Sequence, residues 1–436
     1  MFAIKRGDFD GVIDVKRHGI AKLSLFSRQV SDYCSILESK INVAKLKDEI
    51  VDWIRIDDLQ NDPVGIERIR TLPANEMDGI FFEVGSGDVL VARLGPTILN
   101  QKIVMVNDIH RRTLASSEFL VLRCKNKEMA NEVMCVLRTE YFKRIMYAHS
   151  RGSTPSRYRL NREDMLALPF PKLNYATKKS AAEMLYVLNH RASKLREANE
   201  LLHGVDSFVL ERLGIGEISV KSRTAVAVTL KTVKTDNTMG AQYYHPERLA
   251  IIHALENDPG ISTRRLDDIA GFVRNTVSAD EKPYLGLAGV VSNTGELSGV
   301  EEEATGTAFE YQAGDVLYAR LRPYLNKVLL AETSGVCSTE FHVMRIKNAA
   351  VLPEYLAAIM RSKVIVDQTK HMMTGNTHPR ISNDDVRNLR IPIPPMNVQK
   401  SISSEIFRRT NQARLLKHEA ETDWAAAKAR FEKEIL

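Results

Sequence analysis

One stretch of the sequence occurs twice, first as Gly87-Asp88-Val89-Leu90-Val91-Ala92-Arg93-Leu94-Gly95-Pro96 and again as Gly314-Asp315-Val316-Leu317-Tyr318-Ala319-Arg320-Leu321-Arg322-Pro323. Downstream, Ser116-Ser117-Glu118-Phe119 corresponds to Ser338-Thr339-Glu340-Phe341, so the similar segments follow the same order in both halves. The repeating unit is roughly 200 residues long, far longer than the repeats of solenoid proteins. The sequence therefore predicts two similar domains related by approximate two-fold symmetry within one chain.

Each half ends in a long segment with the pattern of a coiled-coil helix. Residues 175–213 and 396–436 carry apolar side chains at intervals of three and four, with charged residues between them. A helix with one narrow apolar stripe needs a partner in water, so we expect the two helices to pack against each other in antiparallel orientation. The alternative is that each helix packs separately on its own domain. The predicted helix–helix contacts are Leu188, Leu195, Leu202, Ala413, Leu416 and Ala420.

The rest of the sequence is typical of domains that mix helices and strands. The duplicated stretch has the pattern of a turn that opens a strand, and residues 119–123 and 341–345 predict further strands. Residues 127–145 and 353–360 each predict a helix, at matching places in the two halves. Residues 214–240 are expected to be a linker, with a strand in its Thr- and Val-rich part at 222–237. The predicted fold class is α+β: two similar mixed α/β domains joined by two long antiparallel coiled-coil helices, with pseudo-two-fold symmetry.

The composition is that of a globular protein without a membrane segment. The chain has 436 residues, of which 44% are hydrophobic, and a net charge of +6. No apolar run approaches the roughly 18 residues of a membrane span, and the first residues lack a signal-peptide core, so a cytoplasmic protein is expected. The mildly basic balance permits binding to a polyanion without proving it.

The motifs of common enzymes are missing from the sequence. It contains no HExxH, no Walker loop, no GxGxxG and no nucleophile elbow, and its four cysteines form no CxxC pair. His149, His371 and His378 stand in or beside loops, where we interpret them as polar loop residues rather than metal ligands. The sequence thus predicts a chain with no catalytic site and no metal.

Two corresponding loops have the composition of a phosphate or base contact. Arg151–Arg159 and Thr374–Arg380 combine Gly, which allows close backbone approach, with Thr, Asn and Arg donors. The alternative is that Asn376 and Thr377 only shape a turn and that Arg380 caps the helix that begins near Ser382. The predicted DNA-binding residues are Arg93, Arg151, Thr154, Arg157 and Arg159 in the first half, and Arg320, Arg322, Thr374, Asn376, Thr377 and Arg380 in the second.

With these features together, the chain resembles the specificity subunits of type I restriction-modification systems. The second half carries the resemblance best, through Tyr243-Tyr244-His245-Pro246-Glu247, Gly314-Asp315, Gly375-Asn376-Thr377 and the Pro-rich segment 391–399 that ends in Gln399. The first half has a shorter version of that segment, Leu168-Pro169-Phe170-Pro171-Lys172-Leu173. The resemblance implies target-recognition domains at 1–174 and 241–395, long conserved helices at 175–213 and 396–436, and a linker at 214–240.

The resemblance also implies a function. Each domain would read one half of a bipartite, asymmetric site in double-stranded DNA, while the paired helices fix the distance between the half-sites. The chain would have no catalytic residues and no cofactor of its own. Two methyltransferase subunits would bind S-adenosylmethionine, and motor-nuclease restriction subunits would use ATP.

Three other interpretations stay open. One is a recognition subunit of another phage-defence DNA-methylation system. Another is a coiled-coil adaptor that binds no DNA. The last is an enzyme whose motif is no longer recognisable, which would turn over DNA without partner subunits.

Overall fold

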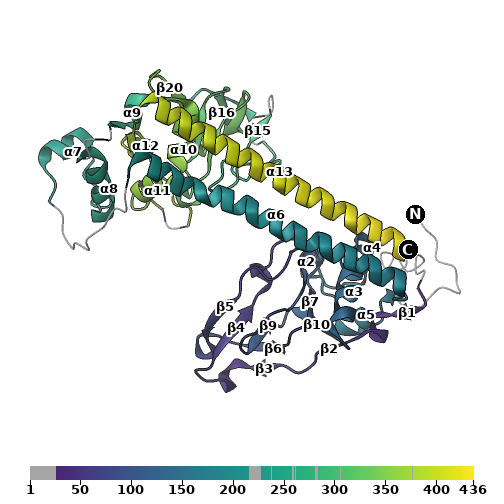
Figure 1. Cartoon of the computed structure of the whole chain (residues 1–436). Helices are drawn as coiled ribbons and strands as arrows, with labels where there is room; N and C mark the ends of the chain where they lie inside the picture. The colour runs from purple at the N-terminus through teal and green to yellow at the C-terminus, as the bar shows by residue number, and fades with distance from the viewer. Residues whose placement is uncertain are drawn as a thin grey trace. The chain divides into compact units, whose positions relative to one another are not determined.

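The computed structural model describes residues 26–215, 227–236, 238–257, 260, 262–279, 283–304, 306–375 and 377–436. It separates into two compact units: Met1–Arg196 with Leu416–Leu436, and Glu197–Leu415. Both units mix helices and strands, and the two long helices, α6 (Tyr175–Leu213) and α13 (Met396–Ile435), each contribute to both (Figure 1). The expected fold class, two mixed α/β domains joined by a pair of long helices, is confirmed.

The first unit is built on two antiparallel or mostly antiparallel sheets. One sheet has the order β2-β10-β7-β8, and the other has the order β3-β6-β9-β4-β5, in which β4 and β9 are parallel. A short pair of strands, β1 (Arg28–Gln29) and β11 (Pro169–Phe170), lies apart from both sheets. The bounds of the sheet strands are β2 Cys34–Ile36, β3 Ile41–Asn42, β4 Ile50–Ile54, β5 Arg70–Pro73, β6 Ile80–Val84, β7 Val89–Ala92, β8 Ile103–Met105, β9 Thr113–Ser116 and β10 Phe119–Cys124.

The duplicated stretch supplies the most buried strand of this unit. All four residues of β7 are buried, because alternate side chains enter two different cores. Leu90 packs between the two sheets with Phe82 and Val121, while Val91 faces the helices in the cluster that contains Leu122 and Phe142. A continuous apolar strand of this kind is expected where both faces of a sheet are covered.

The helices of the first unit correct one expectation. Instead of one helix over 127–145, the structure has α3 (Lys127–Leu137) and α4 (Glu140–His149), with a break at Arg138 and Thr139. The reason is local, because the Thr139 side chain accepts a hydrogen bond from the Phe142 backbone N–H and so begins a new helix. The shorter helices of this unit are α2 (Gly95–Leu99) and α5 (Arg162–Leu166).

The second unit repeats this architecture. Its sheet β13-β20-β17-β18 corresponds strand by strand to β2-β10-β7-β8, and β17 is buried along its whole length as β7 is. The other sheet has the order β14-β16-β19-β15, and β12 pairs with β21 as β1 pairs with β11. The strands are β12 Thr263–Arg265, β13 Ala270–Val273, β14 Thr276–Ser278, β15 Tyr284–Leu285, β16 Thr307–Tyr311, β17 Val316–Ala319, β18 Val328–Leu330, β19 Gly335–Ser338, β20 Phe341–Ile346 and β21 Arg390–Pro392.

The helices of the second unit include one that replaces an expected strand. Residues 230–236 form α7 rather than a strand, and residues 216–226 of the expected linker lie outside the described part of the chain. The Thr229 hydroxyl accepts a hydrogen bond from the Thr232 N–H, and Asp236 at the far end pairs with Arg390, so capping and tertiary contacts outweigh the strand preference of Thr and Val. The other helices are α8 Pro246–Asn257, α9 Leu266–Ile269, α10 Pro353–Arg361, α11 Lys363–Thr369 and α12 Asn383–Arg387.

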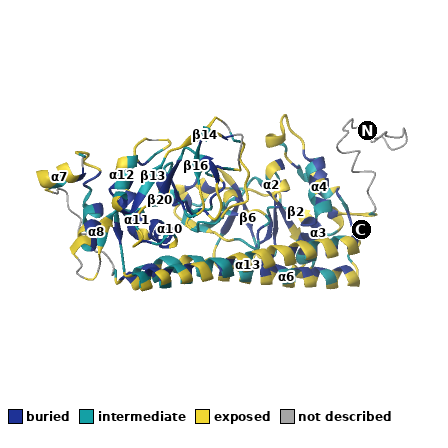
Figure 2. Cartoon of the chain, turned by 90° about the horizontal axis from the view of Figure 1, so that it is seen from above, coloured by how far each residue is buried: buried dark blue, intermediate teal, exposed yellow. Residues whose placement is uncertain are grey.

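In each unit, α6 and α13 pack against each other in antiparallel orientation. In the first unit, Arg191 pairs with Glu421 at 2.9 Å and Lys194 pairs with Glu419 at 3.1 Å, so later residues of α6 meet earlier residues of α13. The same order holds in the second unit, where the Arg212 guanidinium donates to the Ser401 hydroxyl at 3.0 Å. Buried and exposed positions alternate along both helices (Figure 2), as one apolar stripe requires.

The predicted contact residues of these helices differ in burial. Leu188, Ala413 and Ala420 are buried. Leu195, Leu202 and Leu416 are only half-buried. The small side chains at Ala413 and Ala420 let the two helices approach closely, whereas the large Trp424 is buried against the first unit. None of the described helices combines the length and apolar character that crossing a membrane demands.

Candidate nucleic-acid interface

The Gly-Asp pair that opens each duplicated strand holds the fold together. In the second unit, the Asp315 carboxylate accepts from the Gln312 backbone N–H at 2.9 Å and from the Arg345 guanidinium at 2.7 and 2.8 Å. Gly314 adopts φ +88°, which the turn before the strand requires. The role of this motif is therefore to tie a turn to the neighbouring strand.

The first unit makes the same contacts with different residue numbers. The Asp88 carboxylate accepts from the Gly85 N–H at 2.8 Å and from Arg123 at 2.6 and 2.8 Å, and Gly87 has φ +90°. The sequence similarity between the halves thus extends to hydrogen bonds. Any surface that this framework positions in one unit has a counterpart in the other.

Arg93 and Arg320 stand where each duplicated strand meets its candidate loop. The Arg93 backbone N–H donates to the Glu118 carbonyl at 3.1 Å, and its carbonyl accepts from the Leu160 N–H at 2.9 Å. Arg320 does the same with Glu340 at 2.9 Å and Ile381 at 3.0 Å. The backbone of each arginine therefore connects the strand to the end of the loop.

The first candidate loop is a narrow turn closed by two backbone hydrogen bonds. The Arg151 N–H donates to the Arg159 carbonyl at 2.9 Å, and the Arg159 N–H donates to the Arg151 carbonyl at 2.8 Å. A Cβ on Gly152 would lie 2.5 Å from the Arg157 carbonyl oxygen, so only glycine fits at that position. Thr154 and Arg157 lie exposed within the loop. Arg151 also pairs with Asp164 at 3.2 Å.

The second candidate loop is closed in the same way. The backbones of Thr374 and Arg380 exchange two hydrogen bonds of 2.9 Å, and Gly375 has φ +96°. Thr374 and Thr377 are exposed, whereas Asn376 lies outside the described residues. Arg322, with φ +49°, donates its backbone N–H to the Pro379 carbonyl at 2.7 Å and so attaches the loop to the duplicated stretch.

The last arginine of each loop is engaged by a glutamate of the same unit. Arg380 binds both carboxylate oxygens of Glu340, at distances between 2.7 and 3.1 Å, and this hydrogen bonding raises the pKa of the guanidinium. Arg159 binds both oxygens of Glu118 at 3.1 and 3.2 Å. An incoming phosphate would therefore compete with a carboxylate for these donors.

The expectation that Arg380 caps the following helix is not met. The Ser382 side chain fills that role, because it accepts from the Asp385 N–H at the start of α12. The capping alternative for Arg380 is wrong, and its side chain binds the Glu340 carboxylate and donates to the His378 carbonyl.

A cavity beside Arg320 was not predicted from the sequence. It measures about 120 Å³ and is lined by Phe272, Val273, Arg274, Phe309, Arg320, Phe341, His342, Val343 and Asn383. The His342 side chain is buried, its Nε2 has no hydrogen-bond partner within the described structure, and burial lowers its pKa to about 4. The first unit has Leu120 at the position of His342. The replacement of an apolar strand residue by histidine is the sequence difference that could have indicated this cavity.

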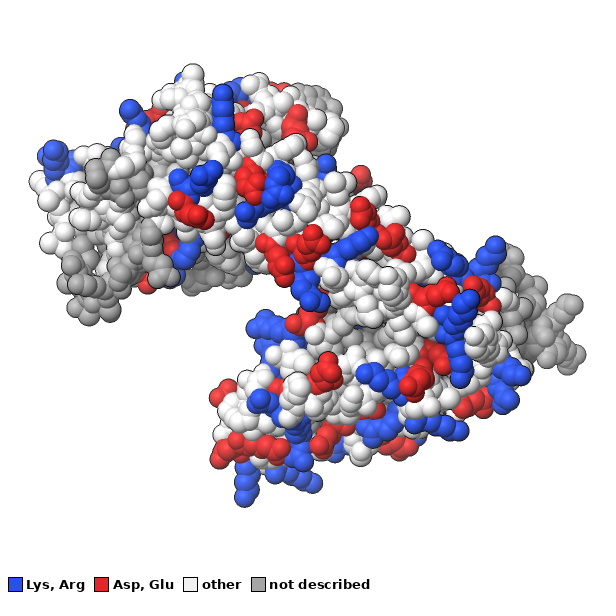
Figure 3. Space-filling model, viewed as in Figure 1, with Lys and Arg blue, Asp and Glu red and all other residues white. Residues whose placement is uncertain are grey.

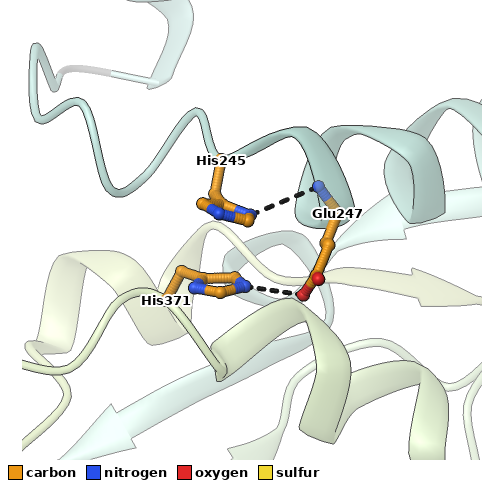
Figure 4. A group of neighbouring side chains, drawn as sticks. All are labelled: His245, Glu247 and His371. Carbon is orange, nitrogen blue, oxygen red and sulfur yellow. Dashed lines mark hydrogen bonds and ion pairs between the residues drawn. The ribbon is translucent and has the colours of Figure 1, made fainter. Parts of the chain in front are cut away.

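Three side chains of the second unit bring together groups that bind metals. His245 and Glu247 lie at the start of α8, and His371 follows α11 (Figure 4). Their ligand atoms all lie within 4.8 Å of one another. The interpretation of His371 as an ordinary loop residue follows from sequence alone, because positions 245 and 371 are remote in the chain.

Charge is distributed rather than concentrated on the visible surface of each unit. Figure 3 shows basic and acidic side chains interspersed on the face that it draws. Many of these charges are paired, such as Arg112 with Glu49 and Glu83 in the first unit. The net charge of +6 therefore gives no single basic patch on this face.

Part of the sequence matches a known protein family. The model of the type I restriction modification DNA specificity domain matches residues 261–422. The type I restriction enzyme EcoDI specificity subunit of Escherichia coli is 27% identical over 149 residues, which are 33% of this chain and 32% of that relative. The match thus spans about a third of the relative's length.

Solved structures extend the likeness to nearly the whole chain. The S subunit of a type I restriction-modification system from M. genitalium aligns over 94% of this chain and 95% of its own, with a TM-score of 0.50 and 11% identity. The HsdS subunit from Thermoanaerobacter tengcongensis aligns over 93% and 95%, with a TM-score of 0.35 and 13% identity. With 11% identity, the M. genitalium structure shows that the two chains share a fold.

These observations define a chain with two mixed α/β units and a pair of long antiparallel helices, in which part of the second unit matches a DNA specificity domain. Over residues 261–422 the chain is therefore similar to the DNA specificity domain of type I restriction-modification systems, and it shares the fold of the M. genitalium S subunit.

Proposed function

We propose that the chain recognises a bipartite, asymmetric site in double-stranded DNA, with one half-site for each unit. The observation that carries this proposal is the recurrence of one loop framework in both units. In each, the arginine directly after the duplicated strand, Arg93 or Arg320, holds a Gly-containing loop by equivalent backbone hydrogen bonds. Exposed donors at the same place in two similar units suit two separate DNA contacts.

Differences between the loops support the reading of different bases. At equivalent places the first loop exposes Arg151 and the second exposes Thr374, and the longer first loop adds the exposed Arg157. The shared parts are backbone contacts and glutamate–arginine pairs, which position a loop without distinguishing sequences. We therefore assign base reading to the exposed side chains that differ, together with Asn376, and phosphate contacts to residues present in both units.

The partners of the chain follow from the same proposal. Two adenine methyltransferase subunits bind it and supply S-adenosylmethionine chemistry, and motor-nuclease subunits bring ATP-dependent restriction. The chain itself contributes recognition and spacing and no catalytic group. The absence of catalytic motifs from the sequence supports this division of roles.

An exchange of one unit tests the proposal. Residues 241–394 are replaced by the matching unit of a relative with a different target, and the adenine methylation of genomic DNA is mapped by sequencing in cells that also express the methyltransferase subunit. One half of the methylated site should change while the other half stays the same. A simultaneous change of both halves would show that the units do not read independently.

Loss of all methylation from the exchanged chain has a control of its own. The parent chain and the donor of the exchanged unit are expressed with the same methyltransferase subunit. If both support methylation and the folded, assembled exchange does not, the division into independent recognition units is contradicted.

A further inference from the structure

A group of three side chains in the second unit has the composition of a transition-metal site. The His371 Nε2 lies 2.7 Å from a carboxylate oxygen of Glu247. The His245 ring stacks on the His371 ring with centroids 3.4 Å apart and an angle of 19° between the planes. Figure 4 shows the two imidazoles one above the other, with the carboxylate beside His371.

We propose that His245, Glu247 and His371 bind a divalent transition-metal ion, with Zn²⁺ as the best match. Two imidazoles and one carboxylate form a ligand set that Zn²⁺ commonly takes, with a water in the fourth position. In a tetrahedral site with bonds of about 2.0–2.1 Å, the ligand atoms lie roughly 3.3 Å apart. The present ligand atoms all lie within 4.8 Å of one another, and side-chain rotation is needed to direct them at one ion.

The backbone already orients one of the ligands. The Glu247 N–H donates to the His245 Nδ1 at 3.3 Å, in the first turn of α8, and the His245 carbonyl accepts from the Leu249 N–H at 3.0 Å. Because Nδ1 accepts this hydrogen bond, the proton of the neutral ring lies on Nε2, and Nδ1 carries the lone pair that a metal requires. A metal at Nδ1 would therefore replace the 3.3 Å contact with the backbone N–H.

A lysine side chain contacts the carboxylate of the proposed site. The Lys370 ammonium lies 2.9 Å from the Glu247 carboxylate. A divalent ion competes with this single charge for the same oxygen, and the affinity of the site therefore depends on residue 370.

The bound metal would connect two segments that are remote in the sequence. Glu247 belongs to α8, and His371 stands three positions before Thr374, where the candidate DNA loop begins. The ion would thus fix the base of that loop to the helix. The first unit has His149 in the place of His371, but Cys34, Ser35 and Ile36 follow its Tyr33, so the ligand set belongs to the second unit alone.

Metal binding by the full-length chain tests the proposal. Zn²⁺ is titrated against a chromophoric chelator, with wild type, His371→Ala, Glu247→Gln and the control His253→Ala, which removes an exposed histidine of α8 outside the group. Wild type and control should each bind one Zn²⁺ more per chain than the two site variants. Equal stoichiometry in all four proteins, each folded by circular dichroism, would overturn the proposal.

Lys370→Met gives a second measurement that does not depend on destroying a ligand. Removal of the competing ammonium should tighten Zn²⁺ binding about fivefold or more, since a unit charge at about 4 Å matters by this much even in a water-like dielectric. If the three residues were merely an ion-pair cluster, this variant would leave Zn²⁺ binding unchanged or weaker. Either of those outcomes would also overturn the proposal.

Discussion

Trp424 donates its indole N–H to the Asp62 carboxylate at 2.6 Å, although the two residues are 362 positions apart. Arg138 and Lys428 pair with the same carboxylate at 2.6 and 2.8 Å. Burial alone would raise the pKa of Asp62, but the charges of Arg138 and Lys428 outweigh it and lower the pKa to about 2. This cluster attaches α13 to the globular part of the first unit.

Removal of the charge at Asp62 should destabilise the protein. Asp62→Asn leaves Arg138, whose side chain is 1% exposed, as a buried guanidinium without its carboxylate partner. The expected loss is about 3 kcal/mol in the free energy of unfolding, measured by urea titration, since breaking one half of a buried pair costs about 3–5 kcal/mol. Asp57→Asn is the matched control, because the Arg55–Asp57 pair is exposed and should change stability by less than about 1 kcal/mol. Equal effects of the two substitutions would contradict the anchoring role of Asp62.

The same carboxylate predicts a pH dependence of stability. The folded-state pKa of Asp62 is about 2, below the unfolded value of about 3.9, so its contribution is complete above pH ~4 and disappears as the pH falls toward 2. The difference of two units corresponds to about 2–3 kcal/mol. Unfolding free energies of wild type and Asp62→Asn, measured between pH 7 and 2, should converge at the acidic end. A gap that stays constant over this range would show that Asp62 does not act through its ionisation.

A charge in the seam between the long helices should be strongly unfavourable. Ala420 is 1% exposed, so Ala420→Glu places an unpaired carboxylate between α6 and α13 and should cost at least about 3 kcal/mol. The exposed neighbour His418 provides the control, and His418→Glu should stay within about 0.5 kcal/mol of wild type. Thermal and urea unfolding give both values. If the two variants are equally stable, the helices are not held together at this position.

The pair of Arg380 and Glu340 allows two opposite effects on DNA binding to be predicted. If Arg380 contacts a phosphate, Arg380→Ala should weaken binding of the methyltransferase-bound complex to cognate and non-cognate DNA alike, and lower the salt slope by about one ion. Glu340→Gln removes the competing carboxylate and should have the opposite effect on affinity, since it frees the guanidinium. Arg408→Ala, an exposed change on α13, controls for the loss of one positive charge.

The pattern of losses across DNA sequences separates two roles of Arg380. A loss of about 1–3 kcal/mol that is confined to sites with one particular base would mean that Arg380 reads a guanine edge. Unchanged affinity of Arg380→Ala for every DNA, with the fold intact by circular dichroism, would assign the residue to the structural pair with Glu340 alone.

Repetition and periodicity along the chain were sufficient to predict the duplicated units and the antiparallel helices. Each copy of the Gly-Asp stretch is a continuous segment, so the repeat can be recognised by direct comparison of the two segments. The apolar stripe of each long helix is likewise visible within that helix, as the seven-residue spacing of Ala413 and Ala420 shows. The break between α3 and α4 was missed even though it is local, because the apolar pattern continues across Thr139 while its hydroxyl starts a new helix.

The tertiary structure alone decided which charged side chains remain available. In the sequence, Arg159 and Arg380 stand in loops whose composition suits phosphate binding. Folding places each guanidinium against the carboxylate of a glutamate about 40 positions earlier. In the same way, His245 and His371 are unremarkable until folding stacks their rings. The physical reason is that secondary structure follows from contacts within a few residues, whereas the partner of a charge, and hence its chemistry, depends on which distant strands and helices pack together.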